Sequence, residues 1–201
     1  MIDTFKSYLL TRYEIDDETA DTIFSLLKTV KVPRGQVLLK QGEICSHVCF
    51  VASGCLRSYV ADKKGKTHTL SFAPKEKWIG DQISMMRREP SMFSIDAVED
   101  SVVLFADHLF FEKMPVIYYK FHQVCINEML DHLRLMEKRI LYLQGAFGDE
   151  RYLDFMKSYP DLALRLPQYM IASYLGISRQ SLSRIRGKLA HTTNNIYNEN
   201  K

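Results

Sequence analysis

The sequence predicts an α+β protein with a strand-rich first half and a helical second half. Short β-branched and aromatic runs, separated by regularly spaced glycines, occupy residues 30–107. An unbroken a/d pattern of apolar residues then runs from Ile126 to Leu143, and two short helices joined by a glycine follow at 167–189. With 201 residues, 46% of them hydrophobic, the chain is long enough to bury a full core.

The first 28 residues predict two short helices, at about 2–12 and 18–28. Asp16 or Asp17 is expected to cap the second helix, because a carboxylate accepts a hydrogen bond from a free N–H group of the first turn. This N-terminal stretch lacks the cationic and apolar segments of a signal peptide, and no apolar run of the chain reaches the roughly 18 residues that span a membrane. We therefore expect a cytoplasmic protein with no membrane partner.

Glycines at positions 35, 42, 54, 65 and 80 punctuate the strand-rich region at intervals of 7, 12, 11 and 15 residues. Several short strands at such intervals are typical of a sandwich or a barrel. A hairpin turn is expected at 62–66. The clearest strands are 37–39, 47–51, 55–60, 67–72 and 101–105.

Neither cysteines nor histidines form a pattern that binds a metal. The cysteines contain no C-x-x-C pair, so we expect reduced, partly buried thiols at Cys45, Cys49, Cys55 and Cys125. No two of the six histidines form an H-x-H or H-x-x-x-H pair. A cupin-like metal enzyme would need several histidines and a carboxylate on neighbouring strands, whereas the strand region offers only His47 and His68. We therefore predict no metal, no cofactor, no catalytic residue and no enzyme activity.

A long helix is predicted after Pro115 and up to Gly145. Its apolar residues are spaced 3, 4, 3, 4 and 3 apart, and we name this set the seam: Ile126, Met129, Leu133, Met136, Ile140 and Leu143. A single core helix can show the same spacing, but Cys125, Leu130 and Leu141 add a second apolar stripe. Because one stripe can pack on the chain's own β domain while the other meets a partner, we expect a homodimer.

A further helix at 149–158 leads through residues 159–161 to the helix pair. Ile171, Ala172 and Leu175 bury the first helix, Gly176 supplies the turn, and Leu182, Ile185 and Leu189 bury the second. Ser178 is expected to cap the second helix. Any helical hairpin has a polar outer side, but here that side carries a set able to bond DNA bases: Arg179, Gln180, Ser183 and Arg184.

The basic charge of the chain is concentrated in this last region. Residues 162–198 contain no Asp or Glu but five basic residues: Arg165, Arg179, Arg184, Arg186 and Lys188. Residues 151–201 hold eight Lys plus Arg against three acids, net +5, so the chain total of +3 leaves net −2 on residues 1–150. A surface that binds phosphates excludes carboxylates in this way.

The order of these features resembles that of the CRP/FNR family of bacterial transcription regulators, over essentially the whole chain. The motifs that carry the resemblance are RGQVLLKQGE at 34–43, VCFVASG at 48–54, KWIGD at 77–81 and IASYLGISRQSLSRI at 171–185. It implies a cyclic-nucleotide-binding-type β-roll within residues 1–114, a dimerisation helix at 115–146 and a helix-turn-helix domain at 147–201. Residues 171–177 and 182–186 are similar to a Bacteroidetes-type branch.

In such a domain the positions matching Arg179, Gln180 and Arg184 touch base edges. Each arginine can donate two hydrogen bonds to guanine, and the glutamine can pair with adenine or accept from cytosine. Ser178 can contact phosphate, and backbone contacts are expected from Arg186 and Lys188. A two-fold dimer would place two such helices about 34 Å apart, so the target is expected to be an inverted repeat in double-stranded DNA. RNA polymerase is a further partner that the resemblance implies.

The effector pocket departs from the pattern of this family. Cyclic-nucleotide binders use a Gly-Glu pair for the ribose and an Arg-Ser pair for the cyclic phosphate, where this chain has Gly80-Asp81 and Ser91-Met92. A buried phosphate without a cation is too costly, so cyclic AMP is not the expected ligand. Arg87 and Arg88 either serve another anion or are simply solvated. The predicted pocket comprises Gly80, Asp81, Gln82, Ser91 and Met92, with an unknown small molecule as its effector.

Two other features of the family are also missing. An iron–sulfur cluster would need closely spaced N-terminal cysteines, but the first cysteine is Cys45. The β-hairpin wing that usually follows the recognition helix is replaced by a polar, Asn-rich stretch at 191–201, for which we expect disorder. A regulatory module that acts on a protein partner is an alternative, but the basic, acid-free C-terminal region argues against it.

Overall fold

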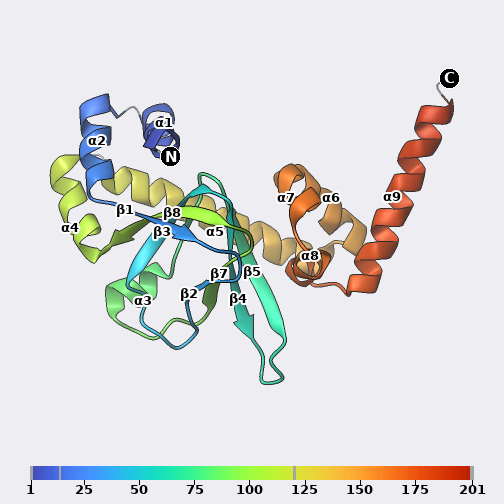
Figure 1. Cartoon of the computed structure of the whole chain (residues 1–201). Helices are drawn as coiled ribbons and strands as arrows, with labels where there is room; N and C mark the ends of the chain where they lie inside the picture. Colours follow the sequence, from blue (N-terminus) through green and yellow to red (C-terminus); the bar gives the residue numbers. More distant parts are fainter. Residues whose placement is uncertain (1, 14, 120, 200–201) are drawn as a thin grey trace. The chain divides into compact units, whose positions relative to one another are not determined.

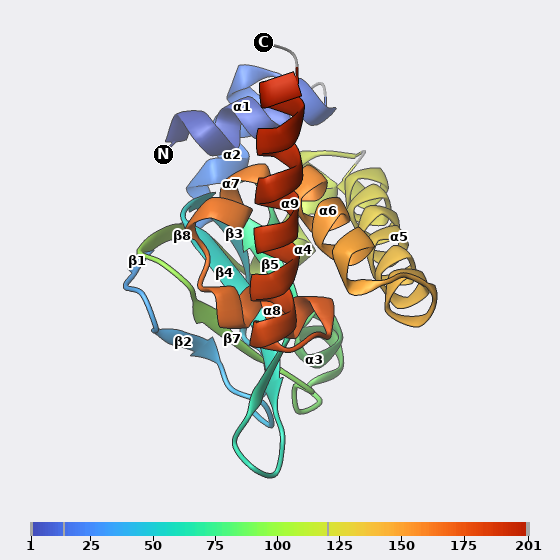
Figure 2. The ribbon, with the colours of Figure 1, turned by 90° about the vertical axis from the view of Figure 1, so that its right-hand side faces the viewer.

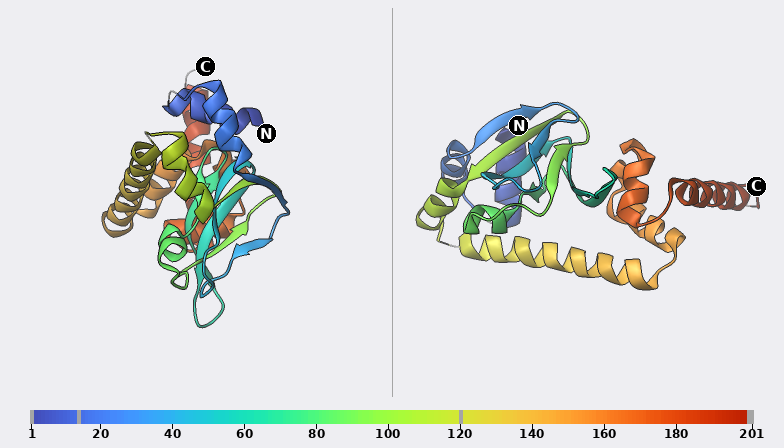
Figure 3. Two further views of the ribbon diagram at one scale, coloured as in Figure 1. Left: turned by 90° about the vertical axis from the view of Figure 1, so that its left-hand side faces the viewer. Right: turned by 90° about the horizontal axis from the view of Figure 1, so that it is seen from below.

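The computed structural model describes residues 2–13, 15–119 and 121–199 (Figure 1). The chain forms two compact units, one up to Asp131 and one from His132 onward. The division falls inside α5 (Phe121–Gly145), a continuous helix that the right panel of Figure 3 shows along its length. Our division at residues 114 and 146 stays a prediction.

The first unit contains two four-stranded antiparallel sheets. One has the order β1-β8-β3-β6, formed by Lys28–Val32, Ser101–Asp107, His47–Ser53 and Trp78–Ile79. The other has the order β2-β7-β4-β5, formed by Val37–Leu39, Ser94–Ala97, Cys55–Ala61 and Thr67–Pro74. Both sheets contribute buried apolar side chains to one cluster, among them Val51, Leu56 and Val103. This core makes the strand-rich region a β-roll, as predicted.

All five strands identified in the sequence are present, and four of them extend one or two residues further than expected. The turn at 62–66 is confirmed, because the Asp62 N–H donates to the Lys66 carbonyl at 2.9 Å and joins β4 to β5. No clear sequence pattern predicts β1, β6 and β7. All four residues of β7 are buried, so the strand shows no polar and apolar alternation.

Helices flank the sheets of the first unit: α1 (Ile2–Tyr13), α2 (Asp17–Ser25), α3 (Gln82–Arg87) and α4 (His108–Ile117). Asp16 caps α2, as predicted, by accepting from the Thr19 N–H at 2.8 Å. The expected extension of α2 to residue 28 is wrong, because Lys28 already pairs with Phe105 in the β1–β8 ladder. Helical structure also begins at His108, before Pro115, because Asp107 provides an N-cap there.

The first helix is joined to the start of α5 by a shared carboxylate. Glu128 accepts hydrogen bonds from the hydroxyls of Tyr8, at 2.9 Å, and Tyr13. Arg12 pairs with the same carboxylate and with Asp131, at 3.1 and 2.7 Å. α1 and the first turns of α5 therefore hold each other in place, although more than 100 residues separate them in sequence.

The second unit is helical. After α5 it contains α6 (Gly148–Ser158), α7 (Pro160–Arg165), α8 (Gln168–Leu175) and α9 (Arg179–Glu199). Its interior is built on fully buried apolar side chains: Phe155, Leu162, Ile171 and Leu182. Figure 2 shows α8 lying against the first turns of α9.

Two expectations for this unit are wrong. Residues 159–161 do not form a simple connection, because Pro160 occupies the first helical position, where its missing N–H costs nothing, and starts α7. The disorder expected from His191 is also not found up to Glu199, where α9 ends. No Gly or Pro follows Gly187 in this stretch, and its Thr and Asn residues disfavour a helix only mildly. Residues 200 and 201 lie outside the described part of the chain.

Candidate nucleic-acid interface

A tight turn joins α8 to α9, as the sequence predicts. Gly176 adopts the left-handed conformation with φ 66°, which ends α8 with little strain because glycine has no Cβ. A Cβ at this position would also lie 2.9 Å from the Leu143 Cδ2 atom. The backbone conformation therefore requires glycine, whereas a Cβ would come this close only to the end of the flexible Leu143 side chain of α5.

Ser178 caps α9, as predicted. Its hydroxyl oxygen accepts from the Ser181 N–H at 3.0 Å and satisfies one of the free donors of the first turn. The first turn contains no acidic residue, so the positive end of the helix dipole is not neutralised there. The Ser181 hydroxyl lies 2.9 Å from the Ser178 hydroxyl and 3.5 Å from Arg184 Nη2.

The apolar side of the helix pair is buried and its polar side is exposed. Ile171, Ala172, Leu175 and Leu182 are buried, while Ile185 and Leu189 are half-buried. The first two turns of α9 bring together five exposed polar residues that we name the reading face: Ser178, Arg179, Gln180, Ser183 and Arg184. Further along α9, Lys188 is exposed and Arg186 is half-buried, so the latter lies at the edge of this side.

The predicted seam is largely exposed in the single chain. Ile126, Met129, Leu133, Ile140 and Leu143 have exposed fractions of 38–59%, and Met136 is half-buried. The expected second stripe is wrong for Leu130 and Leu141, which are also exposed. Only Cys125 packs on the core of the first unit. The reason is helical geometry, since five residues turn the helix by about 140° and separate Cys125 from Leu130.

Part of the predicted effector pocket is bonded internally. One Asp81 oxygen accepts from the Ser84 N–H at 2.9 Å and the other from the Ser91 hydroxyl at 2.8 Å, with Ser91 only 3% exposed. Gly80 allows a close approach of strands, because a Cβ there would lie 2.9 Å from the Val48 Cα atom. Gln82 and Met92 are exposed, the latter at 80%. An effector site formed by these five residues stays a prediction.

Sequence reasoning missed a buried ion pair in the same unit. Arg57 donates to both carboxylate oxygens of Asp96, from Nε at 2.7 Å and from Nη2 at 2.9 Å. Its guanidinium carbon lies 4.5 Å from the centroid of the Tyr59 ring. In the sequence, this pair is visible only as one arginine in the predicted strand at 55–60, because its partner lies 39 residues further along the chain. Asp96 therefore neutralises the charge of Arg57 inside the fold.

The four cysteines are free thiols, as predicted. Burial raises the pKa of Cys45 and Cys49, and that of Cys125 to about 11, so these thiols stay protonated at neutral pH. Within the described ranges no three His, Cys, Asp or Glu side chains come together as a metal site. The described helices also include none that is both long and apolar enough to cross a membrane.

Comparisons with known proteins agree with this architecture. Residues 29–115 match the family model of the cyclic nucleotide-binding domain. The chain is 22% identical over 195 residues to an anaerobic regulatory protein of Pasteurella multocida, covering 91% of this chain and 71% of that protein. It is 20% identical to the fumarate and nitrate reduction regulatory protein of Vibrio cholerae, covering 90% and 77% of the two chains.

Solved structures show the same fold. FixK2 from Bradyrhizobium japonicum superposes with a TM-score of 0.72 at 18% identity, covering 83% of this chain and 86% of that one. A CooA mutant from Carboxydothermus hydrogenoformans gives 0.68 at 19% identity, covering 92% and 83%. The α+β fold with a β-roll and C-terminal helices is thereby confirmed. The Bacteroidetes-type branch stays a prediction.

Proposed function

We propose that this chain, a transcription regulator of the CRP/FNR type, reads a specific DNA sequence as a homodimer. The reading face of α9 carries this proposal. Its polar side chains are exposed on a helix whose opposite side is buried, and it lies in a stretch of 37 residues, from 162 to 198, that contains no acid. A surface of this kind suits the major groove of DNA, where phosphates repel carboxylates.

Within the reading face the residues have different roles. Arg179 and Arg184 each present a fork of donors that fits guanine O6 and N7, and Gln180 fits the edge of adenine. The exposed first turn of α9, with Ser178, offers N–H groups and a hydroxyl to phosphate. Arg186 and Lys188 are assigned to the DNA backbone, where contacts contribute affinity without base preference.

The exposed seam supports the dimer. Water-exposed Ile, Met and Leu side chains along a helix of 25 residues leave apolar surface that a second copy of the same helix can bury. A two-fold pair would present its two reading faces to successive major grooves, about 34 Å apart, and so select an inverted repeat. As a regulator of transcription it would act in the cytoplasm, with RNA polymerase as a further partner.

The effector of this regulator is proposed not to be cyclic AMP. No arginine occupies the position of the phosphate anchor, where Ser91 and Met92 stand, and the carboxylate of Asp81 is already bonded to Ser84 and Ser91. Calorimetry with cyclic AMP should therefore give no heat of binding. Micromolar affinity would contradict this part of the proposal.

Selection of DNA sites from a random pool with the purified chain tests the main proposal. We expect an inverted repeat with half-sites one helical turn apart. The variant Leu133→Asp with Ile140→Asp places two charges in the seam, and should sediment as a monomer and bind the same half-site much more weakly. Recovery of no inverted repeat by the unmodified chain would overturn the dimeric mode of reading.

A further inference from the structure

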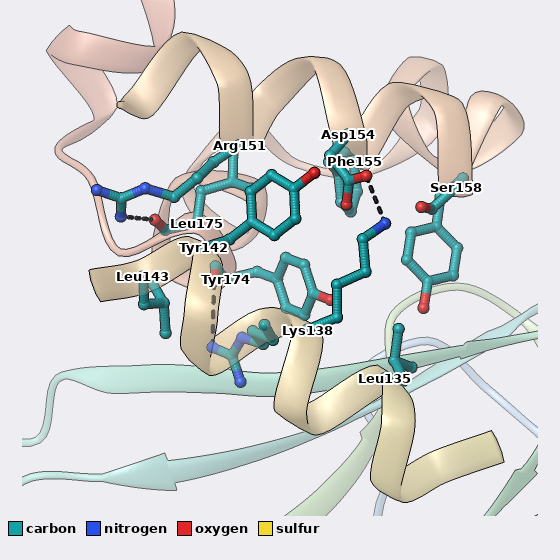
Figure 4. A pocket seen from close by; sticks show the side chains of 12 residues that line it. Leu135, Lys138, Tyr142, Leu143, Arg151, Asp154, Phe155, Ser158, Tyr174 and Leu175 are labelled. Carbon is teal, nitrogen blue, oxygen red and sulfur yellow. Dashed lines mark hydrogen bonds and ion pairs between the residues drawn. The ribbon is translucent and has the colours of Figure 1, made fainter. Parts of the chain in front are cut away.

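Two arginines from different helices donate hydrogen bonds to the C-terminal end of α8. Arg139 of α5 donates from Nη2 to the Tyr174 carbonyl at 3.1 Å. Arg151 of α6 donates from Nη1 to the Leu175 carbonyl at 2.7 Å, the bond drawn beside Leu175 in Figure 4. The last carbonyls of a helix lack partners within the helix and carry the negative end of its dipole, so a cation is the most favourable partner there.

Each guanidinium has a second contact that fixes its position. The Arg139 carbon lies 4.6 Å from the centroid of the Tyr174 ring, and burial lowers the pKa of this arginine. Arg151 also donates from Nε to the Ala146 carbonyl at 3.1 Å, directly after the end of α5. The two arginines therefore connect α8 with both neighbouring helices, α5 and α6.

The arginines lie next to the turn that leads into the reading face. Gly176 follows Leu175 directly, and a Cβ on Gly176 would lie 3.4 Å from Arg151 Nη1. The cavity that Arg139, Arg151 and Tyr174 help to line has a volume of about 40 Å³, which leaves room for a few water molecules only. These side chains therefore form a packed contact between helices and not a ligand pocket.

We propose that Arg139 and Arg151 are positioning residues that set the angle at which α9 presents its reading face to DNA. They act through the backbone of α8 and do not belong to the reading face. Because Arg139 lies on the same helix as the seam, a change in the position of α5 is passed directly to the turn before α9. This inference rests on the proposed function, since it assumes that α9 reads DNA.

Substitution of each arginine by glutamine tests the inference. Arg139→Gln and Arg151→Gln remove the charge and the fork, while Arg134→Gln removes a charge from an exposed position of the same long helix as a matched control. We expect affinity for the selected DNA site to fall about tenfold in the first two variants, as for the loss of one charged hydrogen bond. Affinity for unrelated duplex DNA should stay within about twofold, because it depends on phosphate contacts, which carry no sequence information.

The ratio of these two affinities distinguishes positioning from a loss of folding. A role in stability alone would lower both affinities in the same proportion, and the ratio would equal that of Arg134→Gln. That result would overturn the proposal. If Arg139→Gln does not fold, Arg139→Lys keeps the charge on one donor nitrogen in place of the fork, and should give an intermediate ratio.

Hydrogen–deuterium exchange of the free protein provides a readout that needs no DNA. Exchange over residues 168–182 should be faster in Arg139→Gln and Arg151→Gln and unchanged in Arg134→Gln. If the unmodified chain selects no DNA, the proposed function fails, while the exchange still tests whether the arginines hold the turn. Unchanged exchange in both variants would contradict the positioning role.

Discussion

The two regions in which the sequence predicts a ligand site use polar side chains in opposite ways. In the strand-rich unit, Asp81 and Ser91 are buried and bonded to each other, and Arg57 and Asp96 form a second buried pair. In the helical unit, Arg179 and Gln180 are exposed on α9. Neither side chain donates a hydrogen bond to another residue that the structure describes. Residue type alone indicated a ligand site in both units, but burial separates polar groups that stabilise the fold from those available to a partner.

This difference predicts that polar substitutions in the first unit lower stability, while those on the reading face alter binding with little effect on stability.

The largest effect is expected at the buried ion pair. Asp96→Ala leaves the buried Arg57 without its carboxylate, and should lower the free energy of unfolding by about 3–5 kcal/mol. Asp131→Ala removes a carboxylate that is 64% exposed and also paired with an arginine, and should cost at most about 1 kcal/mol. Urea unfolding of the whole chain measures both. Equal losses would show that burial does not separate the two pairs.

A smaller loss is expected at the predicted effector site. Asp81→Ala removes the N-cap of α3 and the acceptor of the Ser91 hydroxyl, and should cost about 1–3 kcal/mol. Ser91→Ala should cost about 1 kcal/mol. Since the two residues bond each other, the double variant should lose less than the sum of the single losses. Full additivity in thermal unfolding would mean that the bond contributes nothing.

In the helical unit, the turn itself is expected to be sensitive. Gly176→Ala forces a left-handed conformation on alanine and should cost about 1–2 kcal/mol. Gly187→Ala is the matched control, because this glycine is inside α9 with nothing within 4 Å of its added Cβ, and should stabilise by about 0.5–1 kcal/mol. A shift of the same sign in both melting temperatures would argue against a special role of the turn.

The smallest changes in stability, within about 0.5 kcal/mol, are expected on the exposed side of α9. Arg184→Ala should relax base preference at one position of each half-site by about 1–3 kcal/mol. Lys188→Ala should weaken binding to all sequences alike and lower the salt slope by about one. Competition binding over a series of salt concentrations measures both quantities. Identical behaviour of the two variants would contradict the separation of base and backbone contacts.

Long elements with a repeating apolar pattern were predictable from the sequence. Elements too short to show such a pattern were not. The spacing from Ile126 to Leu143 identified α5, and Gly176 with the apolar residues around it identified the turn between α8 and α9. α3 and α7 have only six residues, too few for a helical period, and β6 has two. Their formation depends on neighbours that are distant in sequence, such as Cys49 of β3, which pairs with Ile79 of β6.

The candidate site follows the same rule. Ser178 and the reading face were predictable because a cap and a helix side depend on residues within two turns of each other. The helix contact formed by Arg139 and Arg151 was not predictable, because their hydrogen-bond acceptors are backbone carbonyls, which leave no signature in the sequence. The pairing of Arg57 with Asp96 likewise depends on the alignment of β4 with β7.

The carboxylate of Glu128 limits how this protein can be recombined with its relatives. A chimera that takes its strand-rich unit from one of these proteins and its helical unit from another needs a crossover point within or near α5. A crossover before residue 128 would separate Glu128 and Asp131 from their donors on α1, the two tyrosines and Arg12. A crossover after residue 131 keeps all residues of this cluster, from Tyr8 to Asp131, in the part that comes from one protein. We expect a functional hybrid at this junction.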